Sequence, residues 1–458
     1  MTLPRRLLLA LCWLAALPAT AAAAPPWSAP QNLSAPHLFV FDPAIGFAGD
    51  GSALAAWRWQ DGTRAEAVAG ESAAVRTAGA AAFGSERRLS PAGRAGAPVL
   101  YGRSRAALAL VRPLGSNRDV RSQLRVAFGS ASGAFGASHL IVKRPGIARP
   151  VLAGNASGDL ALVWFEDRRT SNDRVYVSLR RASGSFGAPI LLAQERIRSV
   201  SAAVGPRGDV LVAWDARGIV RTRYGTMGEG GRGSFLRTDT IDSEDTYFAD
   251  LHTAVTGNGR SYVAWGAQLR TEGGTTGPVF FQAAVRPAGS ARFRQAELLD
   301  RLPAERSANP VDLALVGGGN GAVVSWTGFD GTANRVRVSE TNAGGRFGTP
   351  RDVSPSDSTL TDVATDWSGQ RLVVWTTGTA SPRSVQAAYA APGAAFGAPE
   401  LISTGMEADS AVAAFEPQES PDPLASAPTV VWVSRPDGST HPLAEIRTYA
   451  QAATRSGQ

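Results

Sequence analysis

The sequence predicts an all-β fold built from one repeated unit. Three observations support this prediction: a high glycine content, a shortage of helix-forming patterns, and the return of the same strand pattern along nearly the whole chain. The 458 residues include 50 Gly and 29 Pro, and 44% of them are hydrophobic. Gly and Pro interrupt helices and mark turns. The chain is too apolar for a disordered protein, and its length fits either two or three domains or one large repetitive domain.

The clearest repeat element is a short apolar strand that follows a Gly turn and ends in Trp. Three copies are GDGSALAAW, ASGDLALVW and PRGDVLVAW. The seven Trp copies end at Trp57, Trp164, Trp214, Trp265, Trp326, Trp375 and Trp432. An eighth copy, RSRAALALV, ends at Val111 instead. The mean spacing of about 54 residues fits a repeat of four short strands.

A second element, a Phe before another short apolar strand, lies between successive Trp strands. It occurs at Phe83, Phe135, Phe186, Phe235, Phe293, Phe347 and Phe396. The Phe strands are one fewer than the Trp-type strands. The missing copy lies at the other end of the chain, where WSAPQNLS at 27–34 matches FGAPELIS at 396–403. We therefore expect the N-terminal strand to complete the last sheet.

Such a closure turns the row of repeats into a ring. Hydrogen bonds between the first and the last strand remove the free sheet edges that a linear array would expose. The sequence thus predicts a single closed β-propeller over residues 25–458, with eight four-stranded blades and with the Trp and Phe side chains between neighbouring sheets. Seven blades are the alternative if the second unit, which lacks its Trp, is not a blade.

Residues 1–24 have the pattern of a secretory signal peptide. Arg5 and Arg6 precede an apolar run from Leu7 to Leu17, and a small-residue cleavage site follows. We expect a secreted, cell-surface or periplasmic protein, exported by the general or the twin-arginine route. Cys12, the one cysteine, belongs to this leader, so the mature domain has no disulfide and depends on its core. No later apolar run is long enough for a transmembrane segment, and we expect a monomer.

The repeats resemble those of secreted bacterial β-propeller proteins over nearly the whole mature chain. They are similar, more distantly and in fold only, to the repeats of sialidases. The Ser-x-Asp-x-Gly-x-Thr-Trp box of sialidases does not occur in the sequence. The resemblance therefore implies the propeller fold and does not imply an activity.

Acidic residues recur where the innermost strand of several units begins. They are Asp42, Asp250, Asp312, Asp362 and, across the insertion at 416–428, Asp409. Arg149 has this position in the third unit. Units five to eight and one are neighbours in a ring, so we expect an arc of five carboxylates at the channel mouth. Such an arc could bind a glycan, an amine or Ca²⁺, with Asp250, Asp312 and Asp362 as the calcium candidates. In the alternative interpretation each Asp caps its own loop.

The loops that follow each Trp and the loops that link the blades vary in length, and such loops commonly carry binding sites. Basic residues such as Arg144 and Arg168 gather in units two to four, and acidic ones such as Asp300 and Asp330 gather in the others. The basic sector lacks interleaved aromatic residues, so no nucleic acid is expected. We predict an exported, non-catalytic protein that binds a glycan, a peptide or a cell-envelope component through this face. It requires no cofactor, with calcium as an optional ligand.

A glycan-processing hydrolase or lyase of sialidase-like type is the alternative. Its candidate catalytic residues are Tyr247, Glu244, Arg149 and Arg168. A Tyr beside a carboxylate can act as an activated nucleophile, and arginines can bind a substrate carboxylate. This hypothesis requires the four side chains to converge in one pocket.

Overall fold

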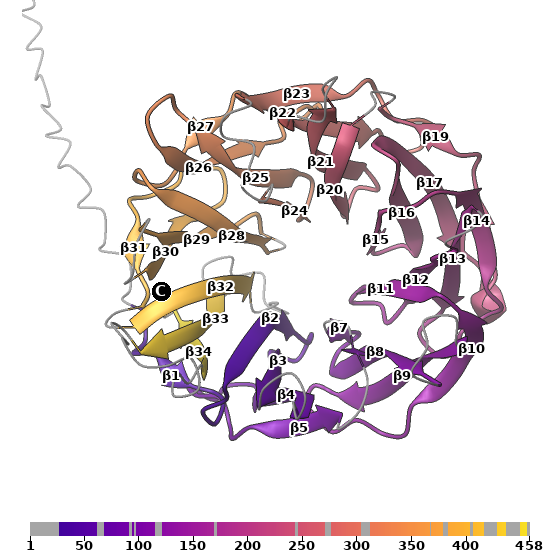
Figure 1. Cartoon of the computed structure of the whole chain (residues 1–458), viewed down its shortest axis with the longest axis horizontal. Helices are drawn as coiled ribbons and strands as arrows, with labels where there is room; N and C mark the ends of the chain where they lie inside the picture. Colours follow the sequence, from indigo (N-terminus) through magenta and orange to yellow (C-terminus); the bar gives the residue numbers. More distant parts are fainter. Residues whose placement is uncertain are drawn as a thin grey trace, which may run out of the picture.

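The computed structural model describes residues 27–61, 68–90, 94–95, 98–114, 121–168, 172–242, 246–270, 276–303, 312–366, 368–378, 383–403, 406–415, 428–436 and 449–455. Their strands form eight antiparallel sheets, which surround a common centre as the blades of a propeller (Figure 1). The all-β, eight-bladed prediction is confirmed, and the seven-bladed alternative is wrong. The leader at 1–24 lies outside the described residues. Within these ranges, no helix is long and apolar enough to cross a membrane.

The first four blades follow one another along the chain, each with its strands in sequence order from the centre outwards. Blade 1 holds β2 (Phe39–Phe47), β3 (Ala53–Asp61), β4 (Val68–Arg76) and β5 (Arg87–Ser90). Blade 2 holds β6 (Arg94–Ala95), β7 (Val99–Tyr101), β8 (Arg105–Pro113), β9 (Arg121–Ser130) and β10 (His139–Pro145). Blade 3 holds β11 (Ile147–Gly154), β12 (Leu160–Glu166), β13 (Asp173–Arg180) and β14 (Ile190–Glu195). Blade 4 holds β15 (Ser199–Val204), β16 (Asp209–Ala216), β17 (Ile219–Met227), the short 3₁₀ helix η1 (Glu229–Gly231), β18 (Gly233–Phe235) and β19 (Asp239–Thr240).

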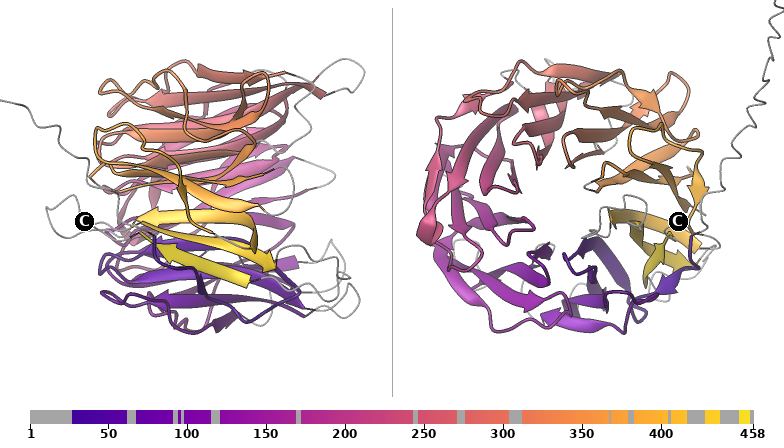
Figure 2. Two further views of the ribbon diagram at one scale, coloured as in Figure 1. Left: turned by 90° about the vertical axis from the view of Figure 1, so that its left-hand side faces the viewer. Right: turned by 180° about the vertical axis from the view of Figure 1, so that it is seen from behind.

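The second half of the ring repeats this order, and the side view shows the blades stacked around the axis (Figure 2). Blade 5 holds β20 (Thr246–Val255), β21 (Ser261–Arg270), β22 (Thr276–Arg286) and β23 (Glu297–Leu302). Blade 6 holds β24 (Leu313–Gly317), β25 (Ala322–Phe329), β26 (Asn334–Glu340) and β27 (Arg351–Asp352). Blade 7 holds β28 (Ser358–Thr365), β29 (Arg371–Thr377), β30 (Ser384–Ala390) and β31 (Glu400–Leu401). Blade 8 holds β32 (Met406–Phe415), β33 (Pro428–Pro436), β34 (Tyr449–Thr454) and β1 (Gln31–Asn32).

The N-terminal strand closes the ring as the sequence predicts. In β1, Gln31 pairs with Ala452 of β34, and the Ser28 amide donates to the Thr454 carbonyl at 2.8 Å. The indole of Trp27 donates to the Glu400 carboxylate of blade 7 at 2.7 Å. Two chain ends that are far apart in sequence thus share one sheet, and neither is left as a free edge.

The segment that follows β1 is fixed to blade 1 through His37. This imidazole is buried and stacks on Trp59, with their ring centroids 4.6 Å apart. Its Nδ1 lies 2.9 Å from an Asp61 oxygen, and its Nε2 lies 3.4 Å from a Glu86 oxygen. Two carboxylates and a stacked ring account for this histidine, so its role is to hold the chain where it passes from blade 8 to blade 1.

The repeated spacing of Trp places a buried indole between neighbouring blades, except between blades 1 and 2. The seven repeat Trp side chains are at most 1% exposed. Each packs against the preceding blade, as Trp164 of blade 3 does against Ala109 and Leu124 of blade 2. An indole buries roughly 150–250 Å², which at about 25 cal/mol per Å² gives an upper estimate of about 4–6 kcal/mol each. The propeller is therefore held together mainly through its inter-blade faces.

In blade 2 the residue that replaces Trp is Leu110, and the prediction of Val111 was one position out. Leu110 follows Arg105, which pairs with Tyr101 across the tight turn, by five residues. Trp164 and Trp214 follow the corresponding turn residues Asp159 and Asp209 by the same five residues. Side chains alternate along a strand, so Val111 faces blade 3 and packs in that cluster. The periodicity of the apolar run alone does not distinguish the two adjacent residues.

Several indole N–H groups are held by an acidic residue of the preceding blade. Trp214 donates to Glu195 at 2.6 Å, and Arg221 pairs with the same carboxylate at 2.5 Å. Trp326 donates to Asp300 at 2.8 Å, and Arg337 pairs with Asp300 at 2.8 Å. Asp300, which the sequence suggested as part of an acidic rim, is therefore neutralised in a contact between blades.

Deleting residues 25–34 from the mature protein is expected to lower the melting temperature by about 5 °C or more. The deletion exposes the edge of β34 and removes the Trp27 packing and its hydrogen bond. Differential scanning calorimetry of the protein that begins at residue 25, against the one that begins at residue 35, measures this. An unchanged transition would show that β1 does not carry the closure.

Candidate functional site

Three of the predicted carboxylates lie on neighbouring inner strands. Asp250 is in β20 of blade 5, Asp312 directly precedes β24 of blade 6, and Asp362 is in β28 of blade 7. These strands line the centre of the ring (Figure 1). The repeat thus places on neighbouring blades three acidic residues that are 50 or more positions apart in sequence.

Asp250 and Asp312 lie at the same level of the channel, because each is opposite the residue that follows the Trp of its own blade. Asp250 pairs with Gly266, the residue after Trp265, and the amide of Thr327, the residue after Trp326, donates to the Asp312 carbonyl at 3.2 Å. Burial raises the pKa of Asp312 to about 6, against the hydrogen bond from Thr327, and the nearby charge of Asp250 raises it further. The charge of Asp250 in blade 5 thus acts on the carboxyl group of Asp312 in blade 6.

Asp362 lies two residues deeper in the channel than Asp250 and Asp312. It pairs with Val374, the residue before Trp375, in a register that continues to the tight turn, where Thr365 pairs with Arg371. Burial raises the pKa of Asp362 to about 6. Its carboxylate accepts the amides of Ala413 in blade 8 and of Val363, both at 2.8 Å. One role of Asp362 is therefore to join blades 7 and 8, which differs from the alternative interpretation, in which each Asp caps its own loop.

His252 belongs to this group although the sequence gave no reason to include it. His252 pairs with Ala264, the residue before Trp265, and is therefore at the level of Asp362. It follows Asp250 by two residues in β20, so the side chains of Asp250 and His252 point to the same side of the strand. Its Nε2 lies 3.3 Å from an Asp250 oxygen, and its charge lowers the pKa of Asp362. The signal that could have identified it is the Asp-x-His spacing on an inner strand. We call Asp250, His252, Asp312 and Asp362 the acidic channel wall.

The other predicted binding residues lie elsewhere around the ring. Asp42 is in blade 1, 63% exposed, and pairs with Arg58 at 2.7 Å. Arg149 is exposed in a bulge of β11 in blade 3, where its φ is 45°. The backbone of Asp409 is in β32 of blade 8, and its side chain lies outside what the structure describes. Asp42, Arg149 and Asp409 therefore lie around the same centre as the other three, but Asp42 forms an ion pair with Arg58 of its own blade.

The candidate catalytic residues come from two separate blades. Arg168 follows β12 of blade 3 and lies 3.5 Å from the fully buried Glu166, which Arg144 approaches at 3.4 Å from the other side. The backbone of Tyr247 is in β20 of blade 5, so blade 4 lies between them. The side chain of Tyr247 and the whole of Glu244 lie outside the described residues. The sialidase-like arrangement therefore stays a prediction.

Metal binding finds no support in the geometry. In the part of the chain that the structure describes, no three His, Cys, Asp or Glu side chains are placed to hold a metal ion. Asp250, Asp312 and Asp362 lie at two different levels, and Asp362 uses its oxygens on backbone amides. These residues do not form a calcium cage as they stand.

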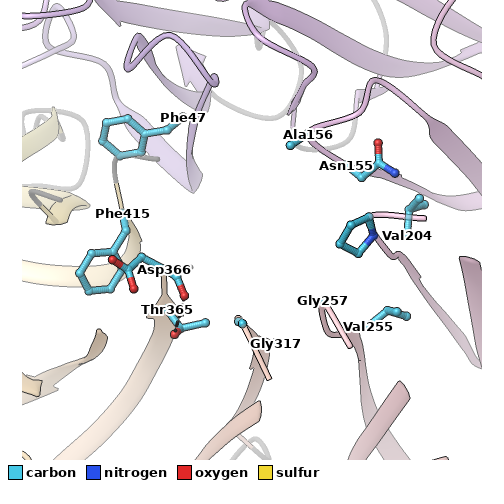
Figure 3. A pocket seen from close by; sticks show the side chains of 13 residues that line it. Phe47, Asn155, Ala156, Val204, Val255, Gly257, Gly317, Thr365, Asp366 and Phe415 are labelled. Atoms are coloured by element: carbon cyan, nitrogen blue, oxygen red, sulfur yellow. Dashed lines mark hydrogen bonds between the residues drawn. The ribbon is translucent and has the colours of Figure 1, made fainter. Parts of the chain in front are cut away.

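A pocket of about 260 Å³ lies at the opposite end of the inner strands, beside the tight Gly turns. Figure 3 shows Phe47 and Phe415 on one side and Val204 and Val255 on the other. Its polar residues are used locally: Asn155 donates to the Gly205 carbonyl at 2.8 Å, and Asp366 accepts the Gln370 amide at 2.8 Å. The sequence did not predict this pocket, because the loops of variable length lie on the other face.

Comparison with known proteins assigns no family to this chain. No protein-family model matches the sequence, and no curated protein matches it. Among solved structures, a PL25 ulvan lyase is similar at 10% identity and a TM-score of 0.44, covering 79% of this chain and 92% of that one. The β-propeller domain of the trilobed protease from Pyrococcus furiosus is similar at 12% identity and a TM-score of 0.42, covering 80% and 95%. A Hadza microbial sialidase is similar at 11% identity and a TM-score of 0.34, covering 73% and 74%. Similarity this distant says nothing about activity.

Replacing Asp312 by Asn is expected to stabilise the protein at pH 8 and to have no effect at pH 4. The folded-state pKa of about 6 lies above the ordinary 3.8, so ionisation of Asp312 costs stability as the pH rises from 4 to 6. Each pKa unit corresponds to about 1.4 kcal/mol, which limits the gain to about 3 kcal/mol.

Urea unfolding of both proteins at pH 4, 6 and 8 measures the difference. The control is Asp357→Asn, because Asp357 is exposed and Asn tolerates its φ of 58°. A stability gain for Asp312→Asn that is equal at all three pH values would contradict burial as the cause.

Proposed function

We propose that the protein is an exported, non-catalytic binding module that holds a glycan, a peptide or a cell-envelope component against its acidic channel wall. The observation that carries this proposal is the placement of Asp250, Asp312 and Asp362 in or directly before the inner strands of three consecutive blades. Carboxylate oxygens accept hydrogen bonds from sugar hydroxyls and form ion pairs with basic side chains. Their spread over three blades favours an extended ligand with several donors over a single small ion.

Burial of the wall favours recognition over simple charge attraction. The two carboxyl groups with raised pKa are partly desolvated before any ligand arrives. A ligand that supplies donors restores the interactions that burial removed, and such charge-assisted bonds are stronger than neutral ones. A cationic or polyhydroxylated group would therefore bind the wall more tightly above pH 6 than below it.

A binding screen tests the proposal directly. The mature protein is applied to a glycan array and to fractionated cell envelope, and any ligand found is titrated against an Asp250→Asn, Asp312→Asn double variant. We expect at least a tenfold loss of affinity, about 1.4 kcal/mol. The Asp357→Asn variant on the same face is the control and should bind as the wild type does. Equal binding by the double variant would show that the ligand binds elsewhere than the acidic channel wall.

A hydrolase or lyase is the second candidate, and one observation favours it. The pKa values of Asp312 and Asp362 are both raised to about 6, and Asp250 contacts His252. Groups that titrate near neutral pH can exchange protons with a substrate. Incubating each bound glycan with the protein and analysing the products by mass spectrometry separates the two functions. Cleavage that the Asp312→Asn variant loses would favour the enzyme.

Calcium is tested separately because the described geometry does not form a cage. If the wall rearranges around the ion, millimolar Ca²⁺ raises the melting temperature of the wild type and not that of the Asp250→Asn, Asp312→Asn variant. Thermal unfolding with Ca²⁺, with Mg²⁺ and with chelator measures this. No shift of the wild type with Ca²⁺ would leave loop capping as the explanation for these residues.

A further inference from the structure

Four arginines gather where blades 5 and 6 meet at the Gly-turn end of the ring. Arg260 ends the turn between β20 and β21, Arg292 and Arg294 lie in the turn between β22 and β23, and Arg346 lies in the turn between β26 and β27. Arg292, Arg294 and Arg346 are exposed, and Arg260 is half-buried. Because successive strands of a blade are antiparallel, these turns lie at the opposite end from the acidic channel wall. We call the four residues the arginine patch.

Two of the guanidinium groups are held by backbone carbonyls of one turn in blade 6. Arg260 donates from Nη2 to the Ala343 carbonyl at 2.6 Å, and Arg294 donates from Nη1 to the Gly344 carbonyl at 3.3 Å. The two carbonyls are consecutive along the chain, so the two guanidinium groups lie within about 10 Å of each other. Gly345 leaves space for this arrangement, because a Cβ there would lie 3.3 Å from Arg260 Cδ. The backbone thus orients both side chains and does not neutralise their charges.

The charges of the arginine patch have no negative counterpart. In the part of the chain that the structure describes, none of its four side chains forms an ion pair with Asp or Glu. Other arginines between blades are paired, as Arg221 is with Glu195 at 2.5 Å and Arg337 is with Asp300 at 2.8 Å. Like charges closer than the Debye length of about 8–10 Å repel each other. An anionic ligand at the patch would offset this repulsion.

The repeat does not require arginines at these positions. Arg292 and Arg346 directly precede the Phe of their repeat units, and Arg294 directly follows it. In the other Phe units, the following position holds one large residue, Leu236. The remaining positions hold small residues: Ala82, Ala134, Ser185, Ser234 and Ala395 before the Phe, and Gly84, Gly136, Gly187, Gly348 and Gly397 after it. Three of the four arginines thus depart from the repeat at a single interface.

The interface between blades 2 and 3 provides an internal comparison. Arg105 of blade 2 lies five residues before Leu110, as Arg260 lies five residues before Trp265. Arg105 donates to the Ala182 carbonyl of blade 3 at 2.9 Å, which is the same kind of contact that Arg260 makes with blade 6. The other three positions of the patch hold small residues at this interface. One arginine is therefore enough for the contact between blades, and the other three are additional.

The composition of the patch indicates an anionic and polar ligand. A guanidinium group can donate two parallel hydrogen bonds to the oxygens of a carboxylate, sulfate or phosphate group. The turns 256–260, 287–296 and 342–346 are described in full, and no large apolar side chain is exposed in them. The patch therefore has no apolar anchor of the kind that protein interfaces use, and no side chain to insert into a membrane. A chain with repeated anionic groups and a hydroxyl-rich body fits this surface.

We infer that the arginine patch binds a polysaccharide that carries carboxylate or sulfate groups. Anionic groups along the polysaccharide contact the guanidinium groups of blades 5 and 6. The carbonyls of the 342–345 turn hold Arg260 and Arg294 in place before the ligand arrives, and side chains ordered in advance lose less entropy on binding. The site is separate from the acidic channel wall and does not depend on the function proposed for that wall.

Dextran, carboxymethyl dextran and dextran sulfate test the inference on the mature protein, because they share one backbone and differ in charge. Biolayer interferometry measures binding at about 50 mM and about 300 mM NaCl. We expect dextran not to bind, and we expect binding of the charged polymers to weaken at least tenfold at the higher salt concentration. Binding of only one charged polymer would identify the anionic group and support the inference. Absence of binding by both, or equal binding of neutral dextran, would overturn it.

Two double variants separate the patch from general charge attraction. Arg292→Gln, Arg346→Gln removes two exposed charges of the patch, and Arg121→Gln, Arg196→Gln removes two exposed charges at the opposite end of the ring. We expect the first variant to lose at least tenfold in affinity for the charged dextrans, about 1.4 kcal/mol, and the second to bind as the wild type does. An equal loss in both variants would show that net charge alone attracts the polymer, and the inference would fail.

A matched pair of single variants tests Arg260. Arg260→Gln and Arg105→Gln each remove one hydrogen bond to a carbonyl of the next blade, so we expect similar, small decreases in the melting temperature. Only Arg260→Gln is expected to weaken binding of the charged dextrans, by about fivefold or more. Equal affinities of these two variants would exclude Arg260 from the site and contradict the inference.

Two further measurements separate this site from the acidic channel wall and from a membrane surface. The Asp250→Asn, Asp312→Asn variant should bind the charged dextrans, so failure at the arginine patch and failure at the acidic channel wall are distinguishable. Vesicles of phosphatidylcholine and phosphatidylglycerol should not bind the protein at physiological salt. Vesicle binding that Arg292→Gln, Arg346→Gln loses, without binding of either charged dextran, would show that a membrane is the partner instead.

Discussion

The structure depends on the packing of one indole against the face of the preceding blade. Each sheet has two apolar faces and cannot bury them alone, so a blade is stable only between two neighbours. Trp supplies the largest apolar surface of any residue. At Trp214, Trp265 and Trp326, the indole N–H donates a hydrogen bond to a carboxylate of the preceding blade. The contact that stabilises the ring also fixes the level of each inner strand.

Inter-blade packing leaves a problem at the ends, because the first and the last blade each need a neighbour. In this chain β1 pairs with β34 as the outer strand of blade 8, and the indole of Trp27 donates a hydrogen bond to Glu400. His37, between Asp61 and Glu86, then fixes the passage into blade 1. The sequence has one cysteine and therefore no internal disulfide, so these contacts provide the closure. A rigid ring results, on which residues of neighbouring blades keep fixed positions.

Such rigidity explains why departures from the repeat are informative. Where the repeat needs only packing, its positions are filled alike: Leu124, Val175 and Phe281 each share a cluster with the Trp of the next blade. At the corresponding position of blade 1 stands Glu71, which is 5% exposed. The acidic channel wall is a second departure from the repeat, and it is spread over three strands rather than confined to one interface.

The spacing of Trp and Phe in the sequence determined the strand repeat, the eight blades and the closure by the N-terminal strand, because each is a consequence of periodic burial. It also placed Asp250, Asp312 and Asp362 on neighbouring strands. Only the tertiary structure decided what those residues do. Strand pairing places Asp362 two residues deeper than Asp250, the fold places His252 beside Asp250, and an ion pair with Arg337 neutralises Asp300. Register and pairing depend on contacts between blades, and a sequence pattern within one blade does not contain them. The same limit explains why Leu110 and Glu71 became visible only when two blades were compared across their interface.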